Sequence, residues 1–156
     1  MNMEEALIGA GCFWGIEEYY RNIDGIQDTK VGYSGGIVND PTYELVCSGN
    51  TEHAEVVKIK FDENIISYQK ILDHFWNCHD PTQFNRQGPD IGSQYRSAIF
   101  YYSENQKTLA LESKKQKQLS LNKKIVTEIK KANKFYLAEE YHQLYIHKNN
   151  SICISR

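Results

Sequence analysis

The strongest chemical signal in the sequence is a cysteine flanked by glycines, in the segment Gly11-Cys12-Phe13-Trp14-Gly15. A short apolar segment precedes Cys12 and a helical pattern follows it, which places Cys12 at a predicted strand-to-helix turn. The unpaired N–H groups at a helix N-terminus stabilise an anion and lower the pKa of a thiol there. We therefore expect Cys12 to be a thiolate nucleophile. The alternative is a small buried cysteine with no reactivity.

Glu55 is a carboxyl group on the apolar face of a predicted strand. Within residues 53–61, Glu55 shares its face with three apolar side chains, those of Val57, Ile59 and Phe61. A carboxyl group that faces a core loses its water and favours the neutral form, which is the form that a general acid needs. Glu55 is thus a candidate proton donor. The alternative is that it reaches water from a frayed strand end.

Further polar candidates lie in loops. A long polar loop at residues 79–94 carries Asp90 and leads into Tyr95, and Tyr43 follows an earlier turn at Pro41. Loops of this length in a compact domain are often functional, and tyrosine hydroxyls can bind a ligand oxygen. The chain holds eleven tyrosines, however, so residue type alone favours a structural role for each of them.

A metal site is the rival interpretation of a second cluster. His74 and Cys78 are one helical turn apart and His79 is adjacent, a spacing that could hold a metal ion. No second close pair of ligand-type residues accompanies them, so a core cysteine with two surface histidines is favoured. The four cysteines contain no C-x-x-C pair and predict neither a zinc ribbon nor a disulfide framework.

Hydrophobic periodicity predicts the elements that position these residues. Strands are predicted at 4–10, 26–34, 53–61 and 95–102, with a weak strand at 124–129. Helices are predicted at 12–21, from an N-cap at Ser67 to Trp76, at 104–118 and at 137–147. The order β-α-β-β-α-β, followed by further elements, predicts an α+β, two-layer split βαβ (ferredoxin-like) sandwich.

Composition and charge exclude several classes of protein. With 156 residues, 40% hydrophobic and 24% charged, the chain is typical of one globular domain. A net charge of −2 gives no general attraction to nucleic acid or to an anionic membrane surface. Residues 103–134 hold nine lysines against three glutamates, which we interpret as a solvated helix face. The N-terminus lacks the pattern of a signal peptide and no apolar run approaches a membrane span, so we expect a cytoplasmic protein.

Together these residues lie in motifs that resemble the A-type methionine sulfoxide reductases, the peptide-methionine (S)-S-oxide reductases. The motifs follow the family's order over nearly the whole chain: GCFWG at 11–15, GYSGG at 32–36, PTYELVCSGNTEHAE at 41–55, HDPTQFNRQGPDIGSQYRSAI at 79–99 and AEEYHQLYIHKN at 138–149. The resemblance implies an α+β sandwich with a mixed sheet. It also implies reduction of the S epimer of methionine sulfoxide, free or in oxidised proteins, without a cofactor.

The resemblance gives each candidate residue a role. Cys12 matches the nucleophile, and Glu55 matches the acid that protonates the sulfoxide oxygen. Phe13 and Trp14 match the rings that enclose the substrate methyl group. Three residues match groups that bind the oxygen or order water around it: Tyr43, Tyr95 and Asp90. The assignment suits the chemistry, because a thiolate can attack the electron-poor sulfur but the oxygen leaves poorly unless it is protonated.

The resemblance also implies how the thiol is restored. Cys153 matches the first recycling cysteine of a loose C-terminal tail, whereas the second one found in some members is absent. We therefore expect a single catalytic domain at 1–148 and a mobile tail at 149–156. The Cys12 sulfenic acid would condense with Cys153 to a disulfide, which thioredoxin or an equivalent dithiol would reduce. We expect the chain to act as a monomer.

Three other functions remain alternatives at this point. A Cys-His acyl hydrolase would need a histidine directed at Cys12, and no histidine has a sequence context that singles it out. A thiol peroxidase would be oxidised fastest by peroxide rather than by a sulfoxide. A non-catalytic metal-binding module would use His74, Cys78 and His79. The sequence also leaves open whether Cys47 or Cys78 can replace Cys153.

Overall fold

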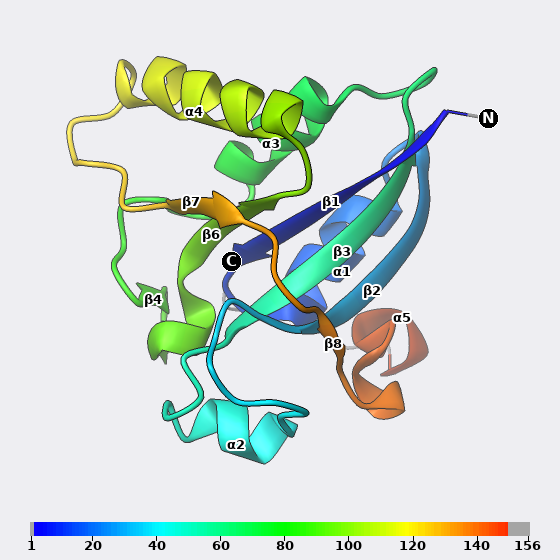
Figure 1. Ribbon diagram of the computed structural model, residues 1–156, viewed down its shortest axis with the longest axis vertical. Helices are drawn as coiled ribbons and strands as arrows, with labels where there is room; N and C mark the ends of the chain where they lie inside the picture. The colour runs from blue at the N-terminus through cyan, green and yellow to red at the C-terminus, as the bar shows by residue number, and fades with distance from the viewer. Residues whose placement is uncertain (1, 150–156) are drawn as a thin grey trace.

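The computed structural model describes residues 2–149, which are built around one six-stranded sheet (Figure 1). Its strands follow the order β7-β6-β1-β3-β2-β8. Their bounds are β1 Met3–Ala10, β2 Ile26–Ser34, β3 Ala54–Asp62, β6 Ser97–Tyr101, β7 Glu128–Lys131 and β8 Tyr136–Leu137. β6 and β7 are parallel and the other neighbours are antiparallel. The four strands β6-β1-β3-β2 form the split βαβ arrangement, so the predicted mixed-sheet α+β sandwich is confirmed.

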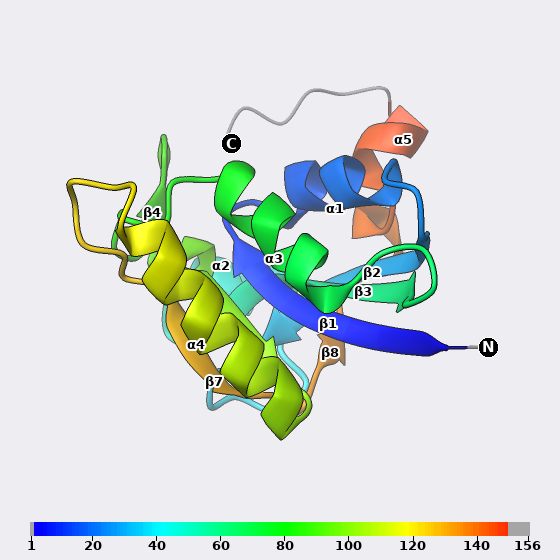
Figure 2. The same cartoon turned by 90° about the horizontal axis from the view of Figure 1, so that it is seen from above.

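Three long helices form the second layer. They are α1 Phe13–Arg21, α3 Tyr68–Asn77 and α4 Glu104–Gln118. α1 and α3 lie on the same side of the sheet, and α4 connects the parallel strands β6 and β7 beside α3 (Figure 2). The predicted N-cap is confirmed, because the Ser67 hydroxyl accepts from the Lys70 N–H at 3.1 Å. Such a cap satisfies a donor that the first turn leaves unpaired.

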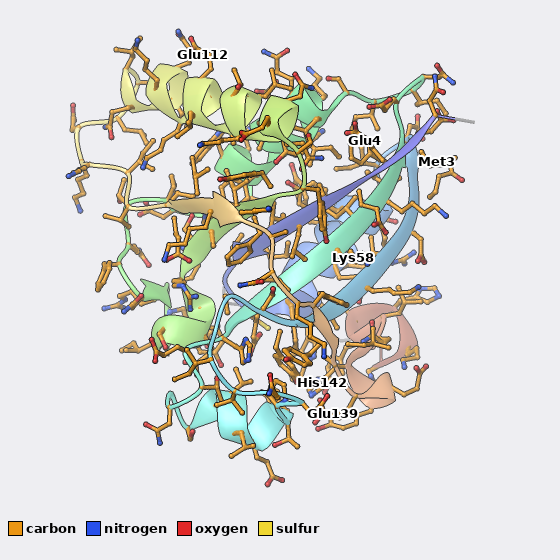
Figure 3. All side chains as sticks on the ribbon, viewed as in Figure 1. Met3, Glu4, Lys58, Glu112, Glu139 and His142 are labelled. Atoms are coloured by element: carbon orange, nitrogen blue, oxygen red, sulfur yellow. The ribbon has the colours of Figure 1, made fainter. Side chains whose placement is uncertain are left out.

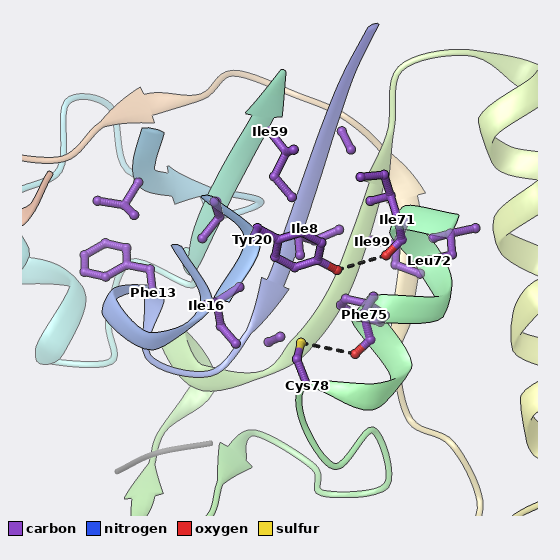
Figure 4. Close-up of a cluster of buried hydrophobic side chains, with 14 of the residues drawn as sticks. Ile8, Phe13, Ile16, Tyr20, Ile59, Ile71, Leu72, Phe75, Cys78 and Ile99 are labelled. Atoms are coloured by element: carbon purple, nitrogen blue, oxygen red, sulfur yellow. Dashed lines mark hydrogen bonds between the residues drawn. The ribbon is translucent and has the colours of Figure 1, made fainter. Parts of the chain in front are cut away.

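The main core lies between the sheet and these helices (Figure 4). Ile8 from β1, Ile59 from β3 and Ile71 from α3 are 0% exposed within it. The buried Tyr20 hydroxyl donates to the Ile71 carbonyl at 2.9 Å, so α1 and α3 are joined by a hydrogen bond as well as by packing. A smaller cluster on the opposite face contains Leu7, Ala54, Val56, Ala98 and Phe100. β1, β3 and β6 are therefore buried on both faces, which fixes their ends firmly in space.

The long loop before β6 has a defined structure of its own. It contains the short antiparallel hairpin β4 (Arg86–Gln87) and β5 (Asp90–Ile91), followed by a 3₁₀ turn, η1, at Ser93–Tyr95. The Gln87 side chain accepts from the Asp80 N–H and donates to the Asp80 carbonyl, both at 2.9 Å. The predicted 79–94 loop is thus closed on itself by hydrogen bonds and holds Asp90 in place.

Two sequence predictions about minor elements are wrong. Residues 137–147 do not form one helix, because β8 at Tyr136–Leu137 leads into a 3₁₀ turn, η2, at Glu140–His142 and a separate helix α5 at Tyr145–Asn149. The predicted strand at 124–129 begins only at Glu128. The Pro41 turn also leads directly into a short helix that periodicity did not reveal, α2 at Tyr43–Cys47. None of the helices within residues 2–149 is long and apolar enough to cross a membrane.

Candidate active site

Cys12 lies where β1 ends and α1 begins, as the glycine-flanked pattern predicts. β1 ends at Ala10, Gly11 makes the turn at a φ of +101°, and half-buried Cys12 is the N-cap residue of α1. A Cβ atom on Gly11 would lie 2.9 Å from the Gln87 side chain, so the turn needs a glycine for space as well as for its left-handed backbone. The thiol therefore sits at the positive end of the α1 dipole.

Glu55 is brought to the same helix end. Glu55 is 2% exposed, and its carboxyl Oε1 accepts a hydrogen bond from the Phe13 backbone N–H at 3.1 Å. Phe13 is the first residue of α1 and directly follows Cys12. The carboxyl group and the thiol, 43 positions apart in sequence, thus meet at one helix N-terminus. The prediction that Glu55 faces inward is confirmed, and the frayed-end alternative is not what the structure has.

The two rings after Cys12 are held in different ways. Phe13 is 1% exposed and packs near Tyr33, with ring centroids 5.8 Å apart. Trp14 is half-buried, and its indole stacks on Tyr145 with centroids 3.9 Å apart and planes 9° apart. Its Nε1 donates to Nδ1 of His142 at 2.9 Å. Both rings therefore have fixed orientations beside the thiol.

Tyr43 and Tyr95 share the electrostatic environment of Glu55. Burial raises the pKa of the Tyr43 hydroxyl, and the neighbouring Cys47 thiol and Glu55 carboxyl raise it further. Burial likewise raises the pKa of Tyr95, with added contributions from Glu55, Cys47, Asp90 and Cys12. Both hydroxyls are thus protonated hydrogen-bond donors near neutral pH. The structure brings together the candidate residues of its described part, with Cys153 outside residues 2–149.

Sequence reasoning missed two side chains that organise this site, Glu139 and His142 (Figure 3). Glu139 accepts from the Tyr33 hydroxyl at 2.8 Å and from the Tyr43 backbone N–H at 3.0 Å. Burial would raise the pKa of Glu139, but these donors and nearby His142 hold it below its usual value. Both residues lie in the AEEYHQLYIHKN motif at 138–149, so the motif marked this segment as part of the family pattern but did not indicate what either side chain does.

The histidines of the metal alternative are occupied by structural hydrogen bonds. His74 Nδ1 pairs with the Tyr19 hydroxyl at 2.8 Å. His79 is buried rather than on the surface, and it contacts the Phe75 carbonyl and the Ser97 hydroxyl, each at 2.7 Å. Burial lowers the pKa of His79 to about 4, so this ring is neutral. Within residues 2–149, no three His, Cys, Asp or Glu side chains gather in a way that could hold a metal ion.

Comparison with known proteins shows the family of this chain. A family model described as peptide methionine sulfoxide reductase matches residues 4–155. The chain is also 53% identical, over 148 residues, to the peptide methionine sulfoxide reductase MsrA of Methanothermobacter thermautotrophicus, a match covering 94% of this chain and 88% of that protein. The chain belongs to the peptide methionine sulfoxide reductase family. It is therefore an oxidoreductase that reduces methionine sulfoxide.

Solved structures place this reductase among the same proteins. Mxr1 from Saccharomyces cerevisiae in its reduced form superposes with a TM-score of 0.94 at 38% identity, covering 99% of this chain and 90% of that one. Mxr1 in complex with Trx2 superposes with a TM-score of 0.67 at 27% identity, covering 92% of this chain and 85% of that one. The fold of the reductase is thus that of the reduced yeast protein.

Proposed function

We propose that Cys12 is the nucleophile and Glu55 the general acid with which this reductase acts on the S epimer of methionine sulfoxide. The observation that carries the proposal is the 3.1 Å hydrogen bond from the Phe13 N–H to Glu55 Oε1. It ties the carboxyl group to the residue next to the thiol. A nucleophile and a proton donor at one helix end are what attack on a sulfoxide requires.

The reaction moves one oxygen atom from the substrate to Cys12. The Cys12 thiolate attacks the electron-poor sulfoxide sulfur while Glu55 donates a proton to the oxygen. The oxygen then leaves the substrate sulfur and ends on Cys12, so the products are methionine and a Cys12 sulfenic acid. The substrate sulfur is reduced by two electrons and the Cys12 sulfur is oxidised by two, so the step needs no further reactant.

The neighbouring side chains suit the two faces of the substrate. Phe13 and Trp14 offer ring surfaces to the methyl group. Tyr43 and Tyr95 offer hydroxyl donors to the oxygen, and Asp90, which acts electrostatically on Tyr95, can order water there. These contacts define one methyl position and one oxygen position. A sulfoxide of the opposite hand would exchange the two and would turn its oxygen toward the rings.

The stereochemical prediction follows from that asymmetry. With racemic methionine sulfoxide and dithiothreitol, the enzyme is expected to consume the S epimer and to leave the R epimer. Chiral chromatography of the residual sulfoxide measures this directly, with heat-denatured enzyme as the control. Equal consumption of both epimers would rule out the pocket. Faster oxidation of Cys12 by peroxide than by either epimer would instead favour a thiol peroxidase.

We assign the recycling step to Cys153, which lies outside the described residues. Its thiol would attack the Cys12 sulfenic acid, forming a disulfide and releasing water. Cys47 is a weaker candidate. Although the residue is exposed, partial burial of its sulfur raises the pKa of the thiol despite a hydrogen bond from Tyr43, and Glu55 and Glu139 raise it further. Less thiolate means slower attack. The complex of yeast Mxr1 with Trx2 supports thioredoxin as reductant. We also propose that the protein is a cytoplasmic monomer, with a single catalytic domain at residues 1–148 and a C-terminal tail at residues 149–156.

Cys153→Ser is expected to separate the chemical step from recycling. The variant should still release about one methionine per enzyme in a single turnover without reductant, because attack on the sulfoxide needs only the Cys12 site. It should accumulate a sulfenic acid that dimedone traps, detected as a mass adduct, and should lose most thioredoxin-driven turnover. Dithiothreitol should restore much of that turnover. Wild-type turnover with thioredoxin would instead assign recycling to another cysteine, which Cys47→Ser and Cys78→Ser in the same background would identify.

A further inference from the structure

His142 lies among the rings of the active site without a place in the proposed chemistry. His142 is 1% exposed. Its ring centroid lies 5.3 Å from that of Phe13, 4.4 Å from that of Tyr43 and 4.1 Å from that of Tyr141. It reaches the site from η2, far along the chain from α1. A buried imidazole in contact with two walls of a substrate site is placed where its protonation state affects those walls.

The hydrogen bond to Trp14 fixes the tautomer of this imidazole. An indole N–H can only donate, so Nδ1 of His142 must accept at the observed 2.9 Å and must carry a lone pair. A neutral imidazole then holds its proton on Nε2. That atom is buried and has no hydrogen-bond partner among the described residues. The fold thus tolerates an unsatisfied donor in order to place an acceptor against Trp14.

We propose that neutral His142 is a positioning residue for the reductase, holding the Trp14 indole in the orientation that receives the substrate methyl group. The inference rests on the proposed function, since it takes Trp14 to be a wall of the substrate site. Stacking on Tyr145 fixes the plane of the indole, and the bond to Nδ1 fixes its rotation within that plane. A protonated imidazole has no lone pair for the indole N–H and releases it.

The groups around His142 keep the ring neutral over the working range. Burial lowers the pKa of His142 from its ordinary 6.5, and the charge of Glu139 opposes that shift without overcoming it. Within residues 2–149, the aromatic rings packed on His142 are those of Phe13 and Trp14 from α1, Tyr43 from α2 and neighbouring Tyr141, and none of these is a cation. The unfolded chain therefore takes up the proton first as pH falls below 6.5. The Trp14 bond is lost only lower, through the depressed pKa.

Two variants separate the hydrogen bond from ring packing. His142→Phe keeps a ring and loses the acceptor, whereas His142→Asn loses the ring and can place an amide oxygen near the position of Nδ1. Because the chain has two tryptophans, each variant is made in a Trp76→Phe background and excited at a wavelength that tyrosine does not absorb, so that Trp14 is the only tryptophan observed. Trp76 is a core residue whose Nε1 donates to the Ser113 hydroxyl, outside the active site. Emission of Trp14 then reports its surroundings without any turnover.

The expected result is a loss in the phenylalanine variant and retention in the asparagine variant. At pH 7.5, His142→Phe should shift Trp14 emission and lower kcat/KM for methionine sulfoxide about three- to tenfold, the effect of one buried hydrogen bond. His142→Asn should keep both within about twofold of the background protein. Circular dichroism checks that each variant is folded. A phenylalanine variant with unchanged emission or unchanged kcat/KM overturns the proposal, because packing alone would then explain His142.

The pH profile supplies a readout that a merely structural ring would not give. In the background protein, Trp14 emission should follow a single titration step whose midpoint lies below pH 6.5, the ordinary pKa of histidine. His142→Asn should show no such step, since an amide does not titrate. A step of equal size in His142→Asn overturns the proposal. These emission results are independent of sulfoxide chemistry, so a failure of Cys12 as nucleophile would leave them standing and the two ideas can fail separately.

Discussion

Cys12→Ser is expected to abolish methionine sulfoxide reduction, to the background of the assay, at any concentration of dithiothreitol. A serine hydroxyl at the α1 N-terminus remains protonated near neutral pH and attacks sulfur poorly. Serine also cannot pass through a sulfenic acid, so the oxygen has no acceptor. The measurement is methionine released in a single turnover, followed by chromatography. Loss there, rather than only in steady state, places the defect in the chemical step.

The other cysteines of the described chain provide matched controls for that result. Cys47 is exposed at the end of α2, and Cys78 is buried with its Sγ donating to the Phe75 carbonyl at 3.3 Å. Cys47→Ser and Cys78→Ser should keep single-turnover rates within a few fold of the unmodified enzyme, since a serine hydroxyl can replace either thiol locally. Substantial activity in Cys12→Ser would contradict the assignment of Cys12 as the nucleophile. If Cys47→Ser or Cys78→Ser were inactive at the same time, that cysteine would be the nucleophile instead.

Local patterns predicted the part of the site that lies on regular elements. The glycine before Cys12 predicted the turn. The structure shows why a glycine is needed there: Gly11 has a left-handed backbone, and a Cβ atom on it would collide with the Gln87 side chain. The alternation of apolar and lysine side chains in residues 57–61 predicted that Glu55 faces inward, because the pleat sends alternate side chains to opposite faces. The Ser67 cap and the apolar spacing after it predicted α3. These features depend on residues a few positions apart, so a single sequence contains them.

The segment after β8 could not be predicted in this way, because distant contacts shape it. The Gln143 side chain accepts from the Val31 N–H and donates to the Val31 carbonyl, each at 2.9 Å. The Leu144 N–H donates to buried Glu17 at 2.7 Å, and Leu144 has a φ of +51°. These bonds replace the intrahelical ones that periodicity at 137–147 predicts. The same contacts carry Glu139 and His142 to the active site, which is why their roles were missed.

Glu55→Gln is the second variant with a large expected effect, a loss of about 10² to 10⁴ in the single-turnover rate near pH 7. The amide keeps the shape of the side chain, and its oxygen can still accept from the Phe13 N–H, so the helix end is preserved. What is lost is the transferable proton. Without it the sulfoxide oxygen must leave as a strongly basic group, which raises the barrier to attack by Cys12.

The pH dependence of that loss distinguishes a proton donor from a structural carboxyl group. As pH falls from 8 to 5, solvent acid partly replaces the missing donor, so the rates of the unmodified enzyme and Glu55→Gln should converge. Glu17 supplies the matched control, because it is a second buried carboxyl group, 1% exposed. Burial raises the pKa of Glu17, and it accepts from Thr29 and Leu144 away from Cys12.

Glu17→Gln can keep both of these contacts, since the amide oxygen can accept from Leu144 while its nitrogen donates to the Thr29 hydroxyl. Its single-turnover rate should therefore stay within a few fold of the unmodified enzyme at every pH between 5 and 8. An equal loss in both glutamine variants would mean that neutralising a buried carboxyl group disturbs α1 as a whole. A Glu55→Gln rate that matches the unmodified enzyme across this range would remove Glu55 from the reaction and leave Tyr43 or Tyr95 as the proton donor.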